Sequence, residues 1–262
     1  MSRRLFDFNI KEWEGSFPEE GNSRFIFSAA IDREGSSGSG KNMKREFTVF
    51  CEPNDDNGFS RTVKIKTISS EIKLNSGSSA VNELLNQLSS LYNTCTLQVK
   101  YDGTVIGVTN YLQIQSDWKK IKQHIEQDYK GSHIRMFTRS IDSRLETEQK
   151  IISDISSFEN FGLLFHSIYG KYDSLSPVVK EFRHMGMKKV YPIRESIKVS
   201  ALNDTNVVLS IEIDTQSSEH IAYSGSYQIN STNQWIEKAS VETKDSYDGV
   251  EIRNEFHLQQ KV

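Results

Sequence analysis

The sequence predicts an α+β protein in which a curved, half-barrel-like antiparallel sheet wraps around a central apolar helix, with two further amphipathic helices. The first observation is that four segments within the last seventy residues alternate apolar and polar side chains with a period of two. The second is that helical spacing of apolar residues is confined to the middle of the chain. The order of strands, helices and a long final run of strands therefore indicates one large antiparallel sheet.

The first part of the chain, residues 20–75, is predicted to be rich in strands and hairpins. Phe25, Phe27 and Ala29 share one parity, and Phe47 and Val49 resume the alternation after a Gly/Ser-rich connection. The strands predicted in this part cover residues 25–31, 47–51 and 63–67, with a weaker strand over 71–74.

The middle part, residues 79–170, is predicted to contain three helices and one hairpin. A helix is expected at 80–93 with Ser79 as its N-cap, and a second, lysine-rich on its outer side, at 111–129. Between them lies Asp102-Gly103, a dipeptide that tolerates the positive φ angles of a tight turn. The most apolar helix is expected over 140–169, with a bend near Ser156-Ser157 or near Asn160 to Gly162.

The last part, residues 187–260, is predicted to be an antiparallel meander. In the strand at 221–229 the odd positions carry Ile, Tyr, Gly, Tyr and Ile, and in the strand at 250–258 one face carries Val250, Ile252, Phe256 and Leu258. Since neither an internal repeat nor a Pro-rich linker interrupts the sequence, residues 1–262 are predicted to form a single α+β domain.

The composition argues against several classes of function. A balance of 32 basic and 35 acidic residues gives a net charge of -3, which provides no general field for nucleic acid. Cys51 and Cys95 are too few for a disulfide framework and lack the spacing of a zinc site, so both are expected to be reduced. No signal peptide and no apolar run of membrane-spanning length is visible, which predicts a cytoplasmic protein without a membrane span.

Two short motifs resemble ligand-binding loops. Residues 35–41 satisfy G-x-x-x-x-G-K, but Asn42 replaces the magnesium-binding hydroxyl and a strand, not a helix, is expected from Met43 onward. We therefore expect no nucleotide there. The Asp55 to Gly58 cluster would place Pro53 and Lys64 where a calcium loop needs carboxylates, so it is predicted to be a turn.

The remaining candidates also favour structural roles. The six histidines show no His-x-x-x-His pair, so no metal site and no cofactor is predicted. Asp142, Glu146 and Glu148 fit a solvated helical face better than a catalytic pair, and no recognisable nucleophile motif is present. Trp118 falls in phase with the apolar side of its helix, which predicts a core tryptophan under a lysine-rich face.

The element order has a counterpart in a known family. The Asp102-Gly103 hairpin, the strand-into-helix passage from Val105 to Tyr111 with Trp118, and the closing strands from Trp235 to Leu258 resemble half-barrel lipoprotein carriers of the LolA and LppX type. The resemblance lies in element order and includes no specific motif. It implies a sheet and a helix that enclose an apolar cavity for a lipid-like ligand. The side chains expected to line that cavity are Phe158, Phe161, Leu164, Phe165, Tyr223 and Tyr227.

The sequence leaves three functional hypotheses. The first is a non-catalytic binding protein that docks a protein partner on its sheet or helix surface, as an adaptor, immunity or secretion-accessory protein does. The second is a carrier of a lipid-like apolar small molecule held between sheet and helix. An enzyme of unrecognised type comes third, because no constellation of residues supports a named reaction. The partner hypothesis ranks ahead of the carrier because the sequence shows no leader to the compartment in which such carriers work.

Overall fold

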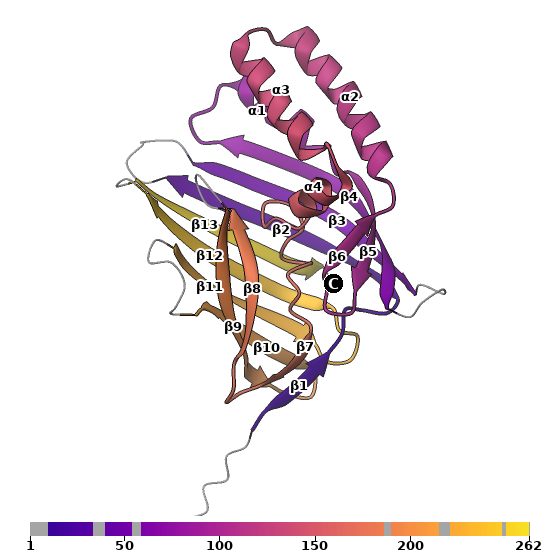
Figure 1. Cartoon of the computed structure of the whole chain (residues 1–262), viewed down its shortest axis with the longest axis vertical. Helices are drawn as coiled ribbons and strands as arrows, with labels where there is room; N and C mark the ends of the chain where they lie inside the picture. The colour runs from indigo at the N-terminus through magenta and orange to yellow at the C-terminus, as the bar shows by residue number, and fades with distance from the viewer. Residues whose placement is uncertain are drawn as a thin grey trace, which may run out of the picture.

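A computed structural model describes residues 10–33, 40–53, 59–185, 190–214, 221–247 and 250–261. Its main feature is an eleven-stranded antiparallel sheet in the order β6-β5-β4-β3-β2-β13-β12-β11-β10-β9-β8, which curves around one face (Figure 1). The strands are β2 (Gly21–Arg33), β3 (Lys41–Pro53), β4 (Ser60–Leu74), β5 (Thr94–Lys100), β6 (Val105–Val108), β8 (Val178–Met185), β9 (Val190–Leu202), β10 (Asn206–Ile213), β11 (Ile221–Asn230), β12 (Ile236–Tyr247) and β13 (Val250–Lys261). Two short strands, β1 (Glu12–Gly15) and β7 (Gly170–Asp173), pair separately. The predicted fold class is confirmed.

The alternation in the sequence separates the two faces of the sheet. Along β3, residues 43, 45, 47, 49 and 51 are buried against the concave side, whereas the residues between them are exposed or half-buried. The predicted Asp102-Gly103 hairpin is present between β5 and β6, and Gly103 has a φ of 90°, a conformation that glycine adopts without strain.

The first and last long strands pair with each other. β2 lies antiparallel to β13, with Phe27 opposite Leu258 and Ala29 opposite Phe256. This pairing joins the strands of the first third of the chain to the final meander in one sheet. Register also places Tyr223, Tyr227, Phe256 and Val250 on the same concave side, although Val250 is 37% exposed near the strand end.

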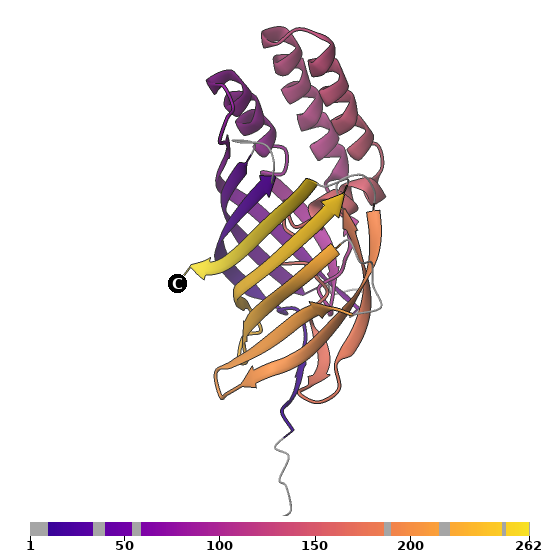
Figure 2. The same ribbon diagram turned by 90° about the vertical axis from the view of Figure 1, so that its left-hand side faces the viewer.

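The described residues form four helices: α1 (Ser79–Ser89), α2 (Tyr111–Asp128), α3 (Ser132–Arg144) and α4 (Glu148–Ile155). The helices predicted at 80–93 and 111–129 correspond to α1 and α2, and the N-cap of α1 is Ser78 rather than Ser79. In both ribbon views α1, α2 and α3 gather at one end of the molecule, beyond the concave sheet, and α2 and α3 form an antiparallel hairpin (Figures 1 and 2).

The predicted apolar helix over 140–169 differs in the structure. It divides into the end of α3 and the short α4, and residues 156–169 continue as turns and irregular chain. The periodic spacing of the apolar residues was therefore misleading beyond Ile155, because irregular chain buried on all sides also carries apolar side chains.

Polar side chains terminate α4. The hydroxyl of Ser157 and the amide of Asn160 donate to the Asp154 carbonyl oxygen at 2.7 and 2.9 Å, which supplies two bonds to a carbonyl at the helix end. A Cβ atom at Gly162 would lie 2.6–2.7 Å from the backbone of residues 156–158, so the close turn there requires glycine.

Candidate functional site

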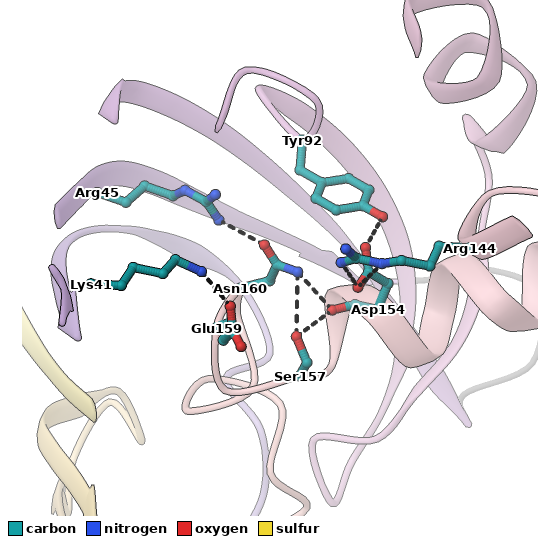
Figure 3. Close-up of polar contacts among 8 residues, drawn as sticks. All are labelled: Lys41, Arg45, Tyr92, Arg144, Asp154, Ser157, Glu159 and Asn160. Atoms are coloured by element: carbon teal, nitrogen blue, oxygen red, sulfur yellow. Dashed lines mark hydrogen bonds and ion pairs between the residues drawn. The ribbon is translucent and has the colours of Figure 1, made fainter. Parts of the chain in front are cut away.

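A polar network, buried except on the side of Arg144, surrounds the C-terminal end of α4 (Figure 3). We call Tyr92, Arg144, Asp154 and Asn160 the Asp154 network. The Asp154 carboxylate accepts from the Tyr92 hydroxyl at 2.5 Å and from the Arg144 guanidinium, and the Asp154 side chain is only 10% exposed. The network therefore connects α3, α4 and the chain between α1 and β5. Burial and the adjacent carboxylate raise the pKa of Tyr92, so its hydroxyl remains a proton donor.

Arg45 extends this network to the sheet. It lies on β3 and is 4% exposed, with Nη1 3.5 Å from the Asn160 side-chain oxygen and the guanidinium carbon 5.0 Å from the centre of the Phe161 ring. Burial lowers the pKa of Arg45. Nearer the rim, Lys41 Nζ and Glu159 Oε2 are 2.7 Å apart, so a second cation on β3 holds the same turn (Figure 3).

A second buried cluster lies deeper in the concave face. His166 Nε2 is 2.9 Å from Glu195 Oε2 and 2.9 Å from the Tyr223 hydroxyl, and the His166 ring stacks on Tyr227 with centroids 6.0 Å apart. Burial raises the pKa of both tyrosines. A carboxylate beside an imidazole is a potential acid–base pair, but the two side chains are 2% and 1% exposed. Because solvent does not reach them, the arrangement supports anchoring of the irregular chain rather than catalysis.

The structure places all six predicted cavity residues in the interior. Phe158, Tyr223 and Tyr227 lie around His166, and the rings of Phe158 and Tyr223 stack with centroids 6.2 Å apart. The others are not part of that group: Phe161 packs on Phe47 at 5.1 Å, Phe165 packs on Phe17 at 5.9 Å, and Leu164 is 1% exposed. Five of the six thus have short-range aromatic partners, and the expectation that they line a void stays a prediction.

Sequence reasoning missed Arg45, Asp154 and Glu195. A usable signal exists for two of them, since Arg45 lies between Met43 and Phe47 on the buried parity of its strand, and Glu195 likewise lies between Ile193 and Ile197. A charged residue at an inward position of a strand requires a partner in the core. Asp154 carries no comparable signal, because the sequence does not show what packs against the end of α4.

The predicted helical carboxylates differ among themselves. Glu146 pairs with Lys150 on the surface, as expected for a solvated face. Glu148, in contrast, accepts the Val108 backbone N–H at 2.7 Å and so satisfies a donor on edge strand β6. Asp142 accepts from the Trp118 indole at 2.8 Å and pairs with Lys122 at 2.7 Å, so it joins α2 to α3. Asp142 remains 41% exposed, so it lies on a solvated face as expected while it joins the two helices. The half-buried Glu148 departs from the expectation, because the sequence does not show what packs beside it.

The loop motifs give no ligand site among the described residues. The strand predicted after the Gly/Ser-rich loop is confirmed as β3, which begins at Lys41 itself. Residues 34–39 and the Asp55 to Gly58 turn lie outside the described residues, as do His220 and the side chain of His184. Within the part of the chain that is described, no three His, Cys, Asp or Glu side chains cluster as metal ligands, and no helix is long and apolar enough to cross a membrane.

The outer surface includes the convex face of the sheet and the α2–α3 hairpin, which differ in shape. The convex face of the sheet carries two shallow hollows of about 400 Å³ each, and both are bordered by Ser226, Ser240 and His257. The α2–α3 hairpin instead projects from the body (Figure 2). Its Trp118 is 3% exposed, which confirms the prediction of a core tryptophan, while Leu112 and Met136 are 64% and 66% exposed.

Comparison with known proteins gives little further information. No protein-family model and no curated protein matches the sequence. Similar solved structures include a LolA superfamily protein from Nitrosomonas europaea, at 6% identity over 93% of this chain and 88% of that chain with a TM-score of 0.17. They also include MucB in complex with MucA(peri), at 8% identity over 92% and 89% with a TM-score of 0.15, and the Pseudomonas aeruginosa MucA/MucB complex, at 8% over 93% and 90% with 0.17. At these TM-scores the likeness carries no argument about function.

Proposed function

We propose that this chain is a non-catalytic binding protein that docks a protein partner on its α2–α3 hairpin. The observation that carries the proposal is the combination of a projecting hairpin and a concave face occupied by the chain itself. Residues 160–166 are all buried against the sheet, so the side that could receive a large ligand is covered from within. The hairpin, in contrast, presents long exposed faces on two helices, and its fully buried residues are few: Ile114, Trp118 and Ile125 on α2, and Thr138 and Ile141 on α3.

Burial on the two sides of α2 supports this assignment. Ile114, Trp118 and Ile125 are at most 3% exposed and attach the helix to the core. Leu112 and Met136 lie on the hairpin surface and are among the large apolar side chains left exposed. Methionine and arginine are enriched at protein interfaces, whose rims are polar and accessible to solvent.

Site-specific photo-crosslinking tests the proposal. A photoreactive amino acid replaces Met136 on the hairpin or, as the matched control, Ser226 on the convex sheet, and both variants are expressed in the cells that produce the protein. We expect one discrete adduct from position 136 and none from position 226, followed by binding of the purified adduct protein to the unmodified chain. No adduct at 136, or the same adducts at both positions, would contradict docking on the hairpin.

The carrier of a lipid-like molecule is the second candidate, and it is favoured by the aromatic lining of the concave face. Phe158, Tyr223 and Tyr227 would form the apolar wall, with His166 and Glu195 as polar anchors. Native mass spectrometry and displacement of a fluorescent fatty acid test this candidate. A carrier retains or exchanges lipid, whereas a protein with a filled interior shows neither.

A further inference from the structure

We infer that the partner of the α2–α3 hairpin presents an acidic segment. This segment binds along the solvent-facing line of contact between α2 and α3, which we call the seam. This inference rests on the proposed docking at the hairpin and specifies its chemistry. The feature that leads to it is a set of three exposed cations, Lys119, Arg135 and Arg139, which we call the seam cations.

Contacts between the helices position the seam cations. Arg135 and Arg139 each precede by three residues a side chain that contacts α2: Thr138 bonds Glu126 at 3.2 Å, and Asp142 pairs with Lys122 at 2.7 Å. Residues three apart lie on the same flank of a helix, so both arginines lie beside the seam.

Lys119 borders the same seam from α2. Lys119 lies one helical turn after Gln115. The Gln115 amide donates to the Leu145 carbonyl oxygen, at the end of α3, at 2.6 Å. Arg135 and Arg139 are separated by about 6 Å along the axis of α3, which is one helical turn. An acidic segment with carboxylates spaced by a helical turn would match that separation.

The described part of the chain leaves the charges of the seam cations unpaired. None of them forms an ion pair with another described residue, whereas the hairpin carboxylates Asp117 and Asp142 do pair, with Lys120 and Lys122. Arginine binds carboxylates through two parallel hydrogen bonds, and both arginine side chains retain that capacity here.

The charge of the hairpin also contrasts with the rest of the molecule. Residues 111–144 contain seven Lys or Arg and four Asp or Glu, a net charge of +3, while the remaining chain has 25 and 31 and a net charge of -6. This separation orients an approaching anionic surface toward the hairpin and away from the rest of the protein.

A protein segment fits the surface better than a membrane does. A helix that lies on a bilayer inserts an apolar face, but Ile114, Trp118 and Ile125 of α2 are buried in the core. Only Leu112 and Met136 remain exposed among the large apolar side chains of the hairpin. The seam can therefore provide charge and hydrogen bonds but little apolar insertion.

Fluorescence anisotropy with defined probes tests the inference. The probe is a labelled 18-residue peptide with glutamate at every fourth position in an alanine-rich background, and the control peptide carries lysine at the same positions. We expect the acidic peptide to bind at low salt, to weaken as salt rises, and to lose at least about tenfold in affinity in Arg135→Glu/Arg139→Glu. The matched control Lys66→Glu/Lys238→Glu makes the same charge change at exposed sheet positions and should alter the affinity less than about twofold.

Each other outcome overturns the inference. No binding of the acidic peptide, or an equal loss in both double variants, would show that the seam cations are not the site. Hairpin-dependent binding to phosphatidylglycerol vesicles without peptide binding would assign the surface to a membrane instead. If the position-136 adduct still forms when Arg135→Glu/Arg139→Glu is added, the inference of an acidic partner segment is wrong, while docking on the hairpin stands. If no adduct forms at position 136 with both arginines present, the docking proposal itself is wrong.

Discussion

Replacing Asp154 with asparagine tests whether the Asp154 carboxylate holds the end of α4 against α3 and against the chain before β5. The substitution keeps the side-chain volume but removes the negative charge with which both Tyr92 and Arg144 interact. One carboxylate oxygen becomes an NH₂ group, so a hydrogen-bond donor then faces the donor group of Tyr92 or Arg144. The backbone carbonyl of Asp154, which Ser157 and Asn160 contact, is unchanged, so the turn after α4 keeps its own bonds.

The expected cost follows from burial. A hydrogen bond to a charged group contributes about 1.5–3 kcal/mol, and removing one partner of a fully buried ion pair costs about 3–5 kcal/mol. Arg144 is 51% exposed and regains hydration when the carboxylate is lost, so its share is small. We therefore expect Asp154→Asn to lower the free energy of unfolding by about 2 kcal/mol, mainly through Tyr92.

Urea unfolding followed by tryptophan fluorescence and circular dichroism measures this cost. Asp117→Asn is the matched control, because its carboxylate pairs with Lys120 on the surface and should change stability by less than about 0.5 kcal/mol. In a double-mutant cycle, Tyr92→Phe and Asp154→Asn should couple by about 1 kcal/mol. Unchanged stability in Asp154→Asn, or strict additivity with Tyr92→Phe, would refute the reasoning.

Three further predictions concern the core and the sheet. Phe256→Ala should cost about 3–5 kcal/mol in urea unfolding and Val250→Ala less than about 1 kcal/mol, because the two share a face but only Phe256 is buried; similar costs would contradict the burial. Burial raises the pKa of Cys51 and Cys95 from 9.0 to about 12, so between these pH values the unfolded chain loses thiol protons first and stability falls as pH rises. In a Cys51→Ala/Cys95→Ala variant the free energy of unfolding should fall less steeply with pH, by at most about 1.4 kcal/mol per pH unit for each thiol. The same slope in the variant and in the unaltered chain would argue against buried thiols. Lys41→Ala should lose only the half-exposed pair with Glu159, at less than about 1 kcal/mol, and ATP binding measured by calorimetry that disappears in this variant would overturn the assignment of a strand there.

The two buried polar clusters have a common role in this fold. Both attach residues 156–166 to the sheet, one through Arg45 and Asn160 near the rim and the other through His166 and Glu195 further inside. Irregular chain buried in a core must satisfy its polar groups locally, and polar partners at defined positions select one arrangement among many apolar ones.

Local patterns in the sequence were sufficient for many of the elements. Alternation with period two identified β2, β3, β11 and β13 because one face of each strand is buried, and the Asp102-Gly103 turn identified the β5–β6 hairpin. Spacing near 3.6 residues identified α1 and α2, and it correctly placed Trp118 in the core. These features depend on contacts within one element and its nearest neighbour, so they are encoded locally.

Tertiary structure decided the rest. The pairing of β2 with β13 joins residues more than two hundred positions apart, and no local pattern specifies that partner. The end of α4 at Ile155 also depends on packing, because the buried chain that follows is as apolar as a helix. The buried charged side chains Arg45, Asp154 and Glu195 acquire their hydrogen-bond partners only in the folded protein, in which the sheet curves around residues 156–166. The sequence determined which residues avoid water, and the fold determined which of them meet.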